Sequence, residues 1–175
     1  MTITQGSAGA RTQAGAVVAK GQLRGFDGGK LRALREGWPL TRVELADLID
    51  QAASSIGRWE SGAQSPDPRT AKRIAELFRV TIRDLVSLAD DDIGLAELRM
   101  LSGQVIADVA QQLEVSRSTL AAVESGHRPP GLLVDGLAAA YGVSSDAIAS
   151  TWARVRERRM AALRAKMTDR ASDAQ

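Results

Sequence analysis

The stretch LADLIDQAASSIGRWESG, residues 45–62, is repeated as VAQQLEVSRSTLAAVESG at residues 109–126. A shift of 64 positions, from residue 45 to residue 109, aligns the two copies without a gap, and both copies end on Glu-Ser-Gly. Apolar positions coincide, as at Ile56 and Leu120. A solenoid needs about three stacked repeats to bury a core. Two copies therefore favour a tandem pair of small domains.

The composition narrows the kinds of site that such a chain can build. Its 175 residues have room for two domains of about 60 to 70 residues each. Cysteine is absent and His127 is the only histidine, which excludes disulfide frameworks and multi-histidine zinc sites and disfavours Cys-His catalysis. No Gly-rich phosphate loop occurs, and Asp90–Asp92 lacks the spacing of a calcium loop. We therefore predict that the protein is not an enzyme and has no catalytic residues, metal or cofactor.

The apolar and charged residues are distributed in a way that bears on location and partners. No apolar run reaches the ~20 residues that cross a bilayer, and the N-terminus does not read as a signal peptide. We expect a cytoplasmic protein without membrane contact. Residues 28–85 carry ten Lys/Arg and eight Asp/Glu, residues 94–150 carry three and six, and residues 151–175 carry seven and three. The second copy is thus the acidic one.

Helical periodicity and capping signals predict five helices and no strand in the first copy. The expected helices span residues 29–36, 41–49, 53–60, 69–78 and 82–88. Thr41 and Glu44 match a capping box at the start of the second helix, and Gly62 suits the left-handed residue that follows the third. Only Asp50-Gln51-Ala52 separates the second helix from the third. Two short helices joined by such a turn form a helix-turn-helix.

The pattern restarts after the three aspartates. Asp92 is placed to cap a helix over residues 93–100, and one residue is lost from the second copy in the loop at residues 127–130. The last helix opens at Ser144 or Ser145 and meets no stop signal before Met167. The predicted organisation is a flexible arm (1–27), a first helix-turn-helix domain (28–88), a linker (89–92), a second such domain (93–150) and a basic helical extension (151–175).

The repeated pattern, with Ala, Leu or Ile, Ser, and the final Glu-Ser-Gly at matching positions, resembles the lambda/434-repressor and Cro family of helix-turn-helix domains, also called XRE-type. The resemblance covers residues 29–88 and 93–148. It implies an all-α fold: two lambda-repressor-like five-helix domains in tandem, followed by a long C-terminal helix. It also implies that the third helix of each domain enters the major groove of double-stranded DNA. A nucleoid-associated location would follow.

The resemblance further implies a set of DNA-contacting positions. Arg42 lies where the family places a polar residue on the phosphate backbone. An arginine at Arg58 or Arg117 could donate to guanine O6 and N7. The candidate DNA-binding residues are Arg42, Ala52, Ala53, Ser54, Ser55 and Arg58 in the first copy, and Ser116, Arg117, Ser118, Thr119, Ala122, His127 and Arg128 in the second.

A structural role is expected for another pair of residues in each copy. Glu60 and Glu124 each follow an arginine, Arg35 and Arg99, by 25 positions. In this family such a pair looks like a buried salt bridge between the first and third helices. Removal of one member of a buried pair leaves an uncompensated charge.

Two functions remain open at this point. The first is a sequence-specific DNA-binding transcriptional regulator that uses one or both domains, either as a pseudo-dimer within one chain or as a homodimer through the C-terminal helix. One observation argues against DNA binding by both domains. Val105 and Ile106 replace Thr41 and Arg42, so the second domain lacks a phosphate contact at that position. The alternative is a protein-interaction or adaptor module whose second, acidic domain mediates dimerisation or partner binding. The sequence of the basic extension is equally consistent with a solvated helix that has no partner and with a helix that mediates dimerisation.

Overall fold

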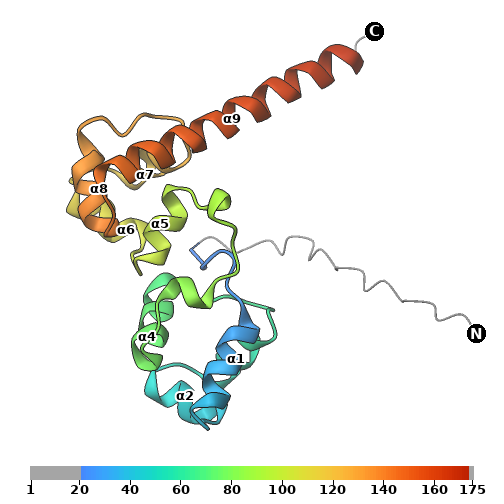
Figure 1. Ribbon diagram of the computed structural model, residues 1–175, viewed down its shortest axis with the longest axis vertical. Helices are drawn as coiled ribbons and strands as arrows, with labels where there is room; N and C mark the ends of the chain where they lie inside the picture. The colour runs from blue at the N-terminus through green and yellow to red at the C-terminus, as the bar shows by residue number, and fades with distance from the viewer. Residues whose placement is uncertain (1–20, 174–175) are drawn as a thin grey trace, which may run out of the picture.

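The computed structural model describes the backbone of residues 21–173 and the side chains as far as residue 170. The predicted arm therefore falls mostly outside the described residues. Two helical bundles follow one another along the chain, and a single long helix projects from the second bundle (Figure 1). Within residues 21–173 the backbone forms no strand, and one isolated bridge joins Phe26 to Val86.

The first bundle contains the first copy of the repeat. Its elements are α1 (Gly28–Gly37), α2 (Arg42–Leu48), α3 (Ala53–Glu60), α4 (Pro68–Phe78) and the 3-10 helix η1 (Ile82–Leu85). Asp27 caps α1 and Asp67 caps α4, each accepting hydrogen bonds from two backbone N–H groups of the first turn. The capping box of Thr41 and Glu44 is confirmed. Gly62 has a φ of 74° just after α3, as expected for a glycine at that position.

The second bundle repeats this plan with local changes. Its elements are η2 (Asp90–Asp92), α5 (Leu95–Leu101), α6 (Ile106–Gln112), α7 (Arg117–Glu124), η3 (Gly131–Leu133), α8 (Val134–Tyr141) and α9 (Ser145–Asp173). With 29 residues, α9 is far longer than its counterpart in the first bundle, as predicted. Val105 precedes α6 without a side-chain cap, as the loss of Thr41 at that position implied.

Three local expectations were wrong. The helix predicted at residues 82–88 is the four-residue η1, because the chain turns to extended backbone at Val86, whose φ is −118° and ψ 143°. Asp92 does not cap α5; it ends η2, and Gly94 precedes α5 with its N–H donated to the Glu97 carboxylate at 3.0 Å. Residues 21–27 do not belong to a flexible arm, because Leu23 is 1% exposed and packs in the first core. The first domain thus begins before residue 28.

Each bundle has its own apolar core. Leu31, Ile56 and Ile74 are completely buried in the first core, and Leu95, Leu120 and Leu137 in the second. Burial of a side chain of this size contributes about 1.5–3 kcal/mol. In the described part of the chain, no single helix is both long and apolar enough to cross a membrane, and only the strongly bent pair Gly131–Tyr141 and Ser145–Arg170 meets that test jointly.

Candidate nucleic-acid interface

The turn between α2 and α3 has the same backbone geometry in both copies. Asp50 adopts a left-handed conformation with φ 53°, and its counterpart Glu114 also has φ 53°. The next residue in each copy closes the turn with a backbone hydrogen bond of 2.9 Å, from Gln51 N to Ala46 O and from Val115 N to Ala110 O. This turn fixes the angle between the two helices, and it therefore fixes the face that α3 presents to solvent.

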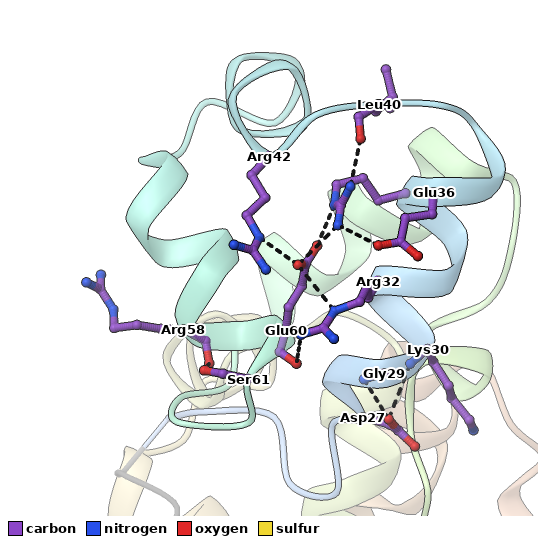
Figure 2. A network of polar contacts seen from close by, with 11 residues as sticks. Asp27, Gly29, Lys30, Arg32, Glu36, Leu40, Arg42, Arg58, Glu60 and Ser61 are labelled. Carbon is purple, nitrogen blue, oxygen red and sulfur yellow. Dashed lines mark hydrogen bonds and ion pairs between the residues drawn. The ribbon is translucent and has the colours of Figure 1, made fainter.

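The third helix of the first bundle is attached to α1 by a buried ion pair (Figure 2). The Glu60 carboxylate is fully buried, and Arg35 donates to it from Nε at 2.5 Å and from Nη2 at 3.3 Å. Arg35 Nη1 also donates to the carbonyl oxygen of Leu40 at 2.8 Å, so one side chain joins α1, α3 and the α1–α2 loop. The predicted pair of Arg35 and Glu60 is confirmed.

Two further arginines lie against the same carboxylate. Arg42 Nε donates to Glu60 Oε2 at 2.8 Å, and Arg32 Nε lies 3.7 Å from that oxygen. The Arg42 and Arg32 side chains are 50% and 46% exposed, whereas Arg35 is 10% exposed. We call these four residues the Glu60 cluster. Three cations face the Glu60 carboxylate, and Glu36 also pairs with Arg35 at 3.2 Å. One positive charge remains in excess, and the two half-exposed guanidinium groups carry it at the surface.

The ionisation of Glu60 follows from these contacts. Burial alone would raise the pKa of its carboxyl group, but the hydrogen bonds from Arg35 and Arg42 and their positive charges outweigh burial and hold the pKa below its ordinary value of 4.5. A carboxyl whose pKa is lowered by folding stabilises the folded state above the unfolded pKa. That stabilisation is lost as the pH falls through the lowered, folded-state pKa.

The second bundle satisfies the equivalent carboxylate differently. Arg99 donates to Glu124 from Nε at 2.8 Å and from Nη2 at 3.2 Å, so this predicted pair is also confirmed. The Tyr141 hydroxyl donates to Glu124 Oε1 at 2.6 Å, and burial followed by the nearby carboxylate charge raises the Tyr141 pKa. The positions of Arg32 and Arg42 are occupied here by Ala96 and Ile106. A neutral phenol thus replaces two surface cations.

The candidate residues of α3 lie mainly on its solvent-facing side. Ala52 and Ser54 are exposed, whereas Ala53 is half-buried and packs against the first core. Arg58 is exposed and points away from the Glu60 cluster (Figure 2). Its Nε donates to Gln64 Oε1 at 2.9 Å and its Nη2 to Ser55 Oγ at 3.1 Å. Arg58 is therefore held at the surface by two neutral partners that another acceptor could replace.

The corresponding residues of α7 divide into capping and free side chains. Ser116 caps the helix by accepting from Thr119 N at 3.0 Å, and its hydroxyl also lies 2.8 Å from Ser118 Oγ. Arg117 is exposed and makes no hydrogen bond or ion pair with the described residues. Ala122 is half-buried. Of this set, Arg117 is the side chain that is most available to an external ligand.

The loop after α7 carries the last two candidates. His127 and Arg128 are exposed, and His127 Nδ1 lies 2.8 Å from Ser125 Oγ. The Arg128 carbonyl accepts a hydrogen bond from Trp152 Nε1 at 3.0 Å, which attaches this loop to α9. Both side chains lie one short loop away from the C-terminal end of α7.

Comparison with known sequences identifies the two bundles. Residues 31–85 match the family described as Helix-turn-helix, and residues 94–150 match the family described as Helix-turn-helix domain. The chain carries two helix-turn-helix domains in tandem. Over 68 residues it is also 40% identical to the HTH-type transcriptional activator BcrR of Enterococcus faecalis; the match covers 39% of this chain and 33% of that protein. The chain therefore spans about a third of the length of that relative. No solved structure matches it.

The two helix-turn-helix domains differ in the chemistry of their exposed faces. The first has Arg58 on α3 and the half-exposed Arg42 and Arg32 at the Glu60 cluster, whereas the second has Arg117 and Arg128 without a cation at the start of α6. Among the side chains described between residues 21 and 170, no group of three or more acidic or histidine residues could hold a metal ion.

Arg32 was missed by the sequence prediction. Its only signal was its position three residues before Arg35, which places both side chains on neighbouring positions of one helix face. That spacing does not say whether Arg32 faces solvent or α3. The structure resolves the point because Arg32 Nη2 reaches the Glu60 carbonyl oxygen at 3.4 Å, where α3 ends.

Proposed function

We propose that this protein is a sequence-specific DNA-binding transcriptional regulator, and that its first helix-turn-helix domain places α3 in the major groove. The observation that carries this proposal is the Glu60 cluster. It fixes α3 against α1 and holds Arg42 and Arg32 half-exposed at the C-terminal end of α3, and this packing leaves Arg58 exposed on the solvent-facing side of the same helix. Phosphate contacts position a protein on the duplex, and side chains on base edges supply specificity. The first domain offers both.

In this proposal the residues of the first domain have distinct roles. Arg42 contacts the phosphate backbone through its two Nη groups, since its Nε is occupied by Glu60. Ala52, Ser54 and Arg58 face the bases, and Arg58 exchanges its contact with Ser55 for guanine O6 and N7. Ala53 supplies only a methyl group, which is partly buried against the first core. The matched relative is named as a transcriptional activator, which supports a role in transcription.

Replacement of Arg42 by alanine is expected to weaken binding to all DNA sequences. Loss of one phosphate contact should reduce the slope of log K against log salt concentration by about 0.9. Fluorescence anisotropy of a labelled operator over a series of salt concentrations measures this slope. Arg73→Ala, which removes an exposed arginine of α4, is the charge-matched control and should leave the slope unchanged. Equal slopes for wild type and Arg42→Ala would remove Arg42 from the DNA interface.

We also propose that two chains pair through the projecting part of α9. Leu163 and Met167 are 40% and 73% exposed, and Met160 lies on the same side at a spacing of three and then four residues. This is the spacing of a short coiled-coil seam. A homodimer would bring two first domains to two half-sites. The competing function is an adaptor whose second domain binds a protein partner. That function would not require DNA binding.

A chain that ends at Arg159 is expected to be monomeric if α9 mediates dimerisation. Truncation must not reach further, because Thr151 is 4% exposed and Arg156 donates to the Gly126 carbonyl at 3.0 Å. Light scattering coupled to size exclusion gives the mass of the full chain, the truncated chain and Leu163→Glu. A fall from dimer to monomer in both variants supports pairing. A full-length chain that is already monomeric at working concentration rules it out.

A further inference from the structure

The second domain is packed against the first through residues of its own first helix. Met100, near the end of α5, is only 8% exposed and belongs to the apolar core of the first domain, and Leu101 packs against that same core. The next residues follow the surface of α4: a Cβ on Gly103 would lie 2.7 Å from Cδ of Lys72. The end of α5 and the turn after it thus form a surface that fits α4.

Two ion pairs also join the two domains. Arg69, in the first turn of α4, donates from Nη2 to Asp108 Oδ1 at 2.6 Å and from Nε to Oδ2 at 3.2 Å. Arg24 donates to Glu97 Oε1 at 3.0 Å. Each pair joins one residue of the first domain to one of the second. The bidentate geometry at Asp108 adds directional specificity to the apolar contact, although the pair itself is partly exposed.

The repeat itself shows that this surface is special to the second domain. The positions of Met100 and Leu101 are occupied in the first domain by Glu36 and Gly37. The Glu36 side chain is 60% exposed, and Gly37 has open space beside it. The shared domain fold therefore does not require apolar residues there. Their presence in the second copy is explained by the contact with α4.

We infer that the second domain is a docked platform rather than a second DNA reader, because its docking surface on α4 includes the end of α6 that would face the phosphate backbone. This rests on the proposed DNA-binding function of the first domain. Asp108 lies in the first turn of α6, at the position of Glu44 in α2, and Ile106 stands where the first domain has Arg42. The Arg69 guanidinium occupies the space beside Asp108, and Val105 and Ile106 add no cation. Base recognition is confined to the first domain, and the second holds α9 in a fixed direction.

The docking is tested by Met100→Glu, which installs the residue that the first domain tolerates at the equivalent position. Because the chain lacks cysteine, spin labels can be placed at two exposed alanines, Ala63 and Ala149, with unlabelled chain added in excess. We expect a single narrow distance distribution for wild type and a broad one for Met100→Glu. Leu132→Glu, at a fully exposed position of the second domain, is the control and should match wild type. A Met100→Glu distribution as narrow as wild type overturns the docking.

The consequence for DNA is tested with the domains docked. In the wild-type background, Arg117→Ala is expected to change operator affinity by less than twofold, whereas Arg42→Ala weakens it at least tenfold. Equal losses would mean that the second domain reads DNA while docked, which contradicts the inference. If the wild-type chain binds no DNA specifically, the proposed function fails, and the spin-label distances still decide whether the domains are docked.

Discussion

Glu60→Ala is expected to lower the free energy of unfolding of the first domain by about 3–5 kcal/mol, because it leaves the buried Arg35 guanidinium without its carboxylate. The same change releases Arg42 and Arg32 from their common anchor. Urea unfolding followed by circular dichroism measures the loss. For a domain of this size such a change should be visible as an early, separate transition.

Two comparisons make the Glu60 result specific. Glu36→Ala removes an exposed carboxylate that also pairs with Arg35, and a surface pair of this kind contributes about 0–1 kcal/mol. The wild-type domain should also lose stability as the pH falls below about 4.5, through the lowered pKa of Glu60, and the alanine variant should lack that part of the pH dependence. If Glu60→Ala costs no more than Glu36→Ala, the buried pair does not attach α3 to α1.

Arg58→Ala is expected to reduce sequence discrimination by about 1–3 kcal/mol, a factor of roughly 5 to 150. Discrimination here is the difference in binding free energy between the operator and a site in which the contacted guanine is changed to another base. Arg58 is exposed on α3, and its described side-chain partners are the neutral groups of Ser55 and Gln64, so exchange of these partners for a base edge costs little. The measurement is competition binding of both sites at one salt concentration.

The matched control for Arg58 keeps the arginine and removes a partner. Gln64→Ala frees the Arg58 Nε and should leave discrimination close to wild type. Loss of affinity by the same factor on operator and altered site would indicate that Arg58 contacts phosphate rather than a base, because phosphate contacts carry no sequence information.

The sequence predicted the features that depend on local signals or on the repeat. The capping box at Thr41, the α2–α3 turn and the length of α9 follow from side chains close in sequence. The two buried ion pairs followed from the 25-residue spacing that both copies share, seen against the family resemblance. Such features are visible because one short segment, or its duplicate, contains all the residues involved.

The features that the sequence did not predict depend on contacts between distant segments of the chain. Arg42 was expected at phosphate alone, but its Nε is occupied by Glu60, and only the packing of α2 on α3 determines this. Met100 lies in the core of the first domain, and the α5 sequence carries no signal for which of the two cores it enters. Leu23 lies in a segment without apolar periodicity, so its burial at 1% exposure had no local signal.

The central claim is that α3 of the first domain reads a DNA sequence. Selection of bound sites from random double-stranded DNA, carried out in parallel with wild type, Arg58→Ala and Arg117→Ala, tests it most directly. We expect wild type and Arg117→Ala to recover the same motif, and Arg58→Ala to recover that motif with one guanine position degenerate. No recovered motif with wild type, or an unchanged motif with Arg58→Ala and an altered one with Arg117→Ala, would contradict the claim.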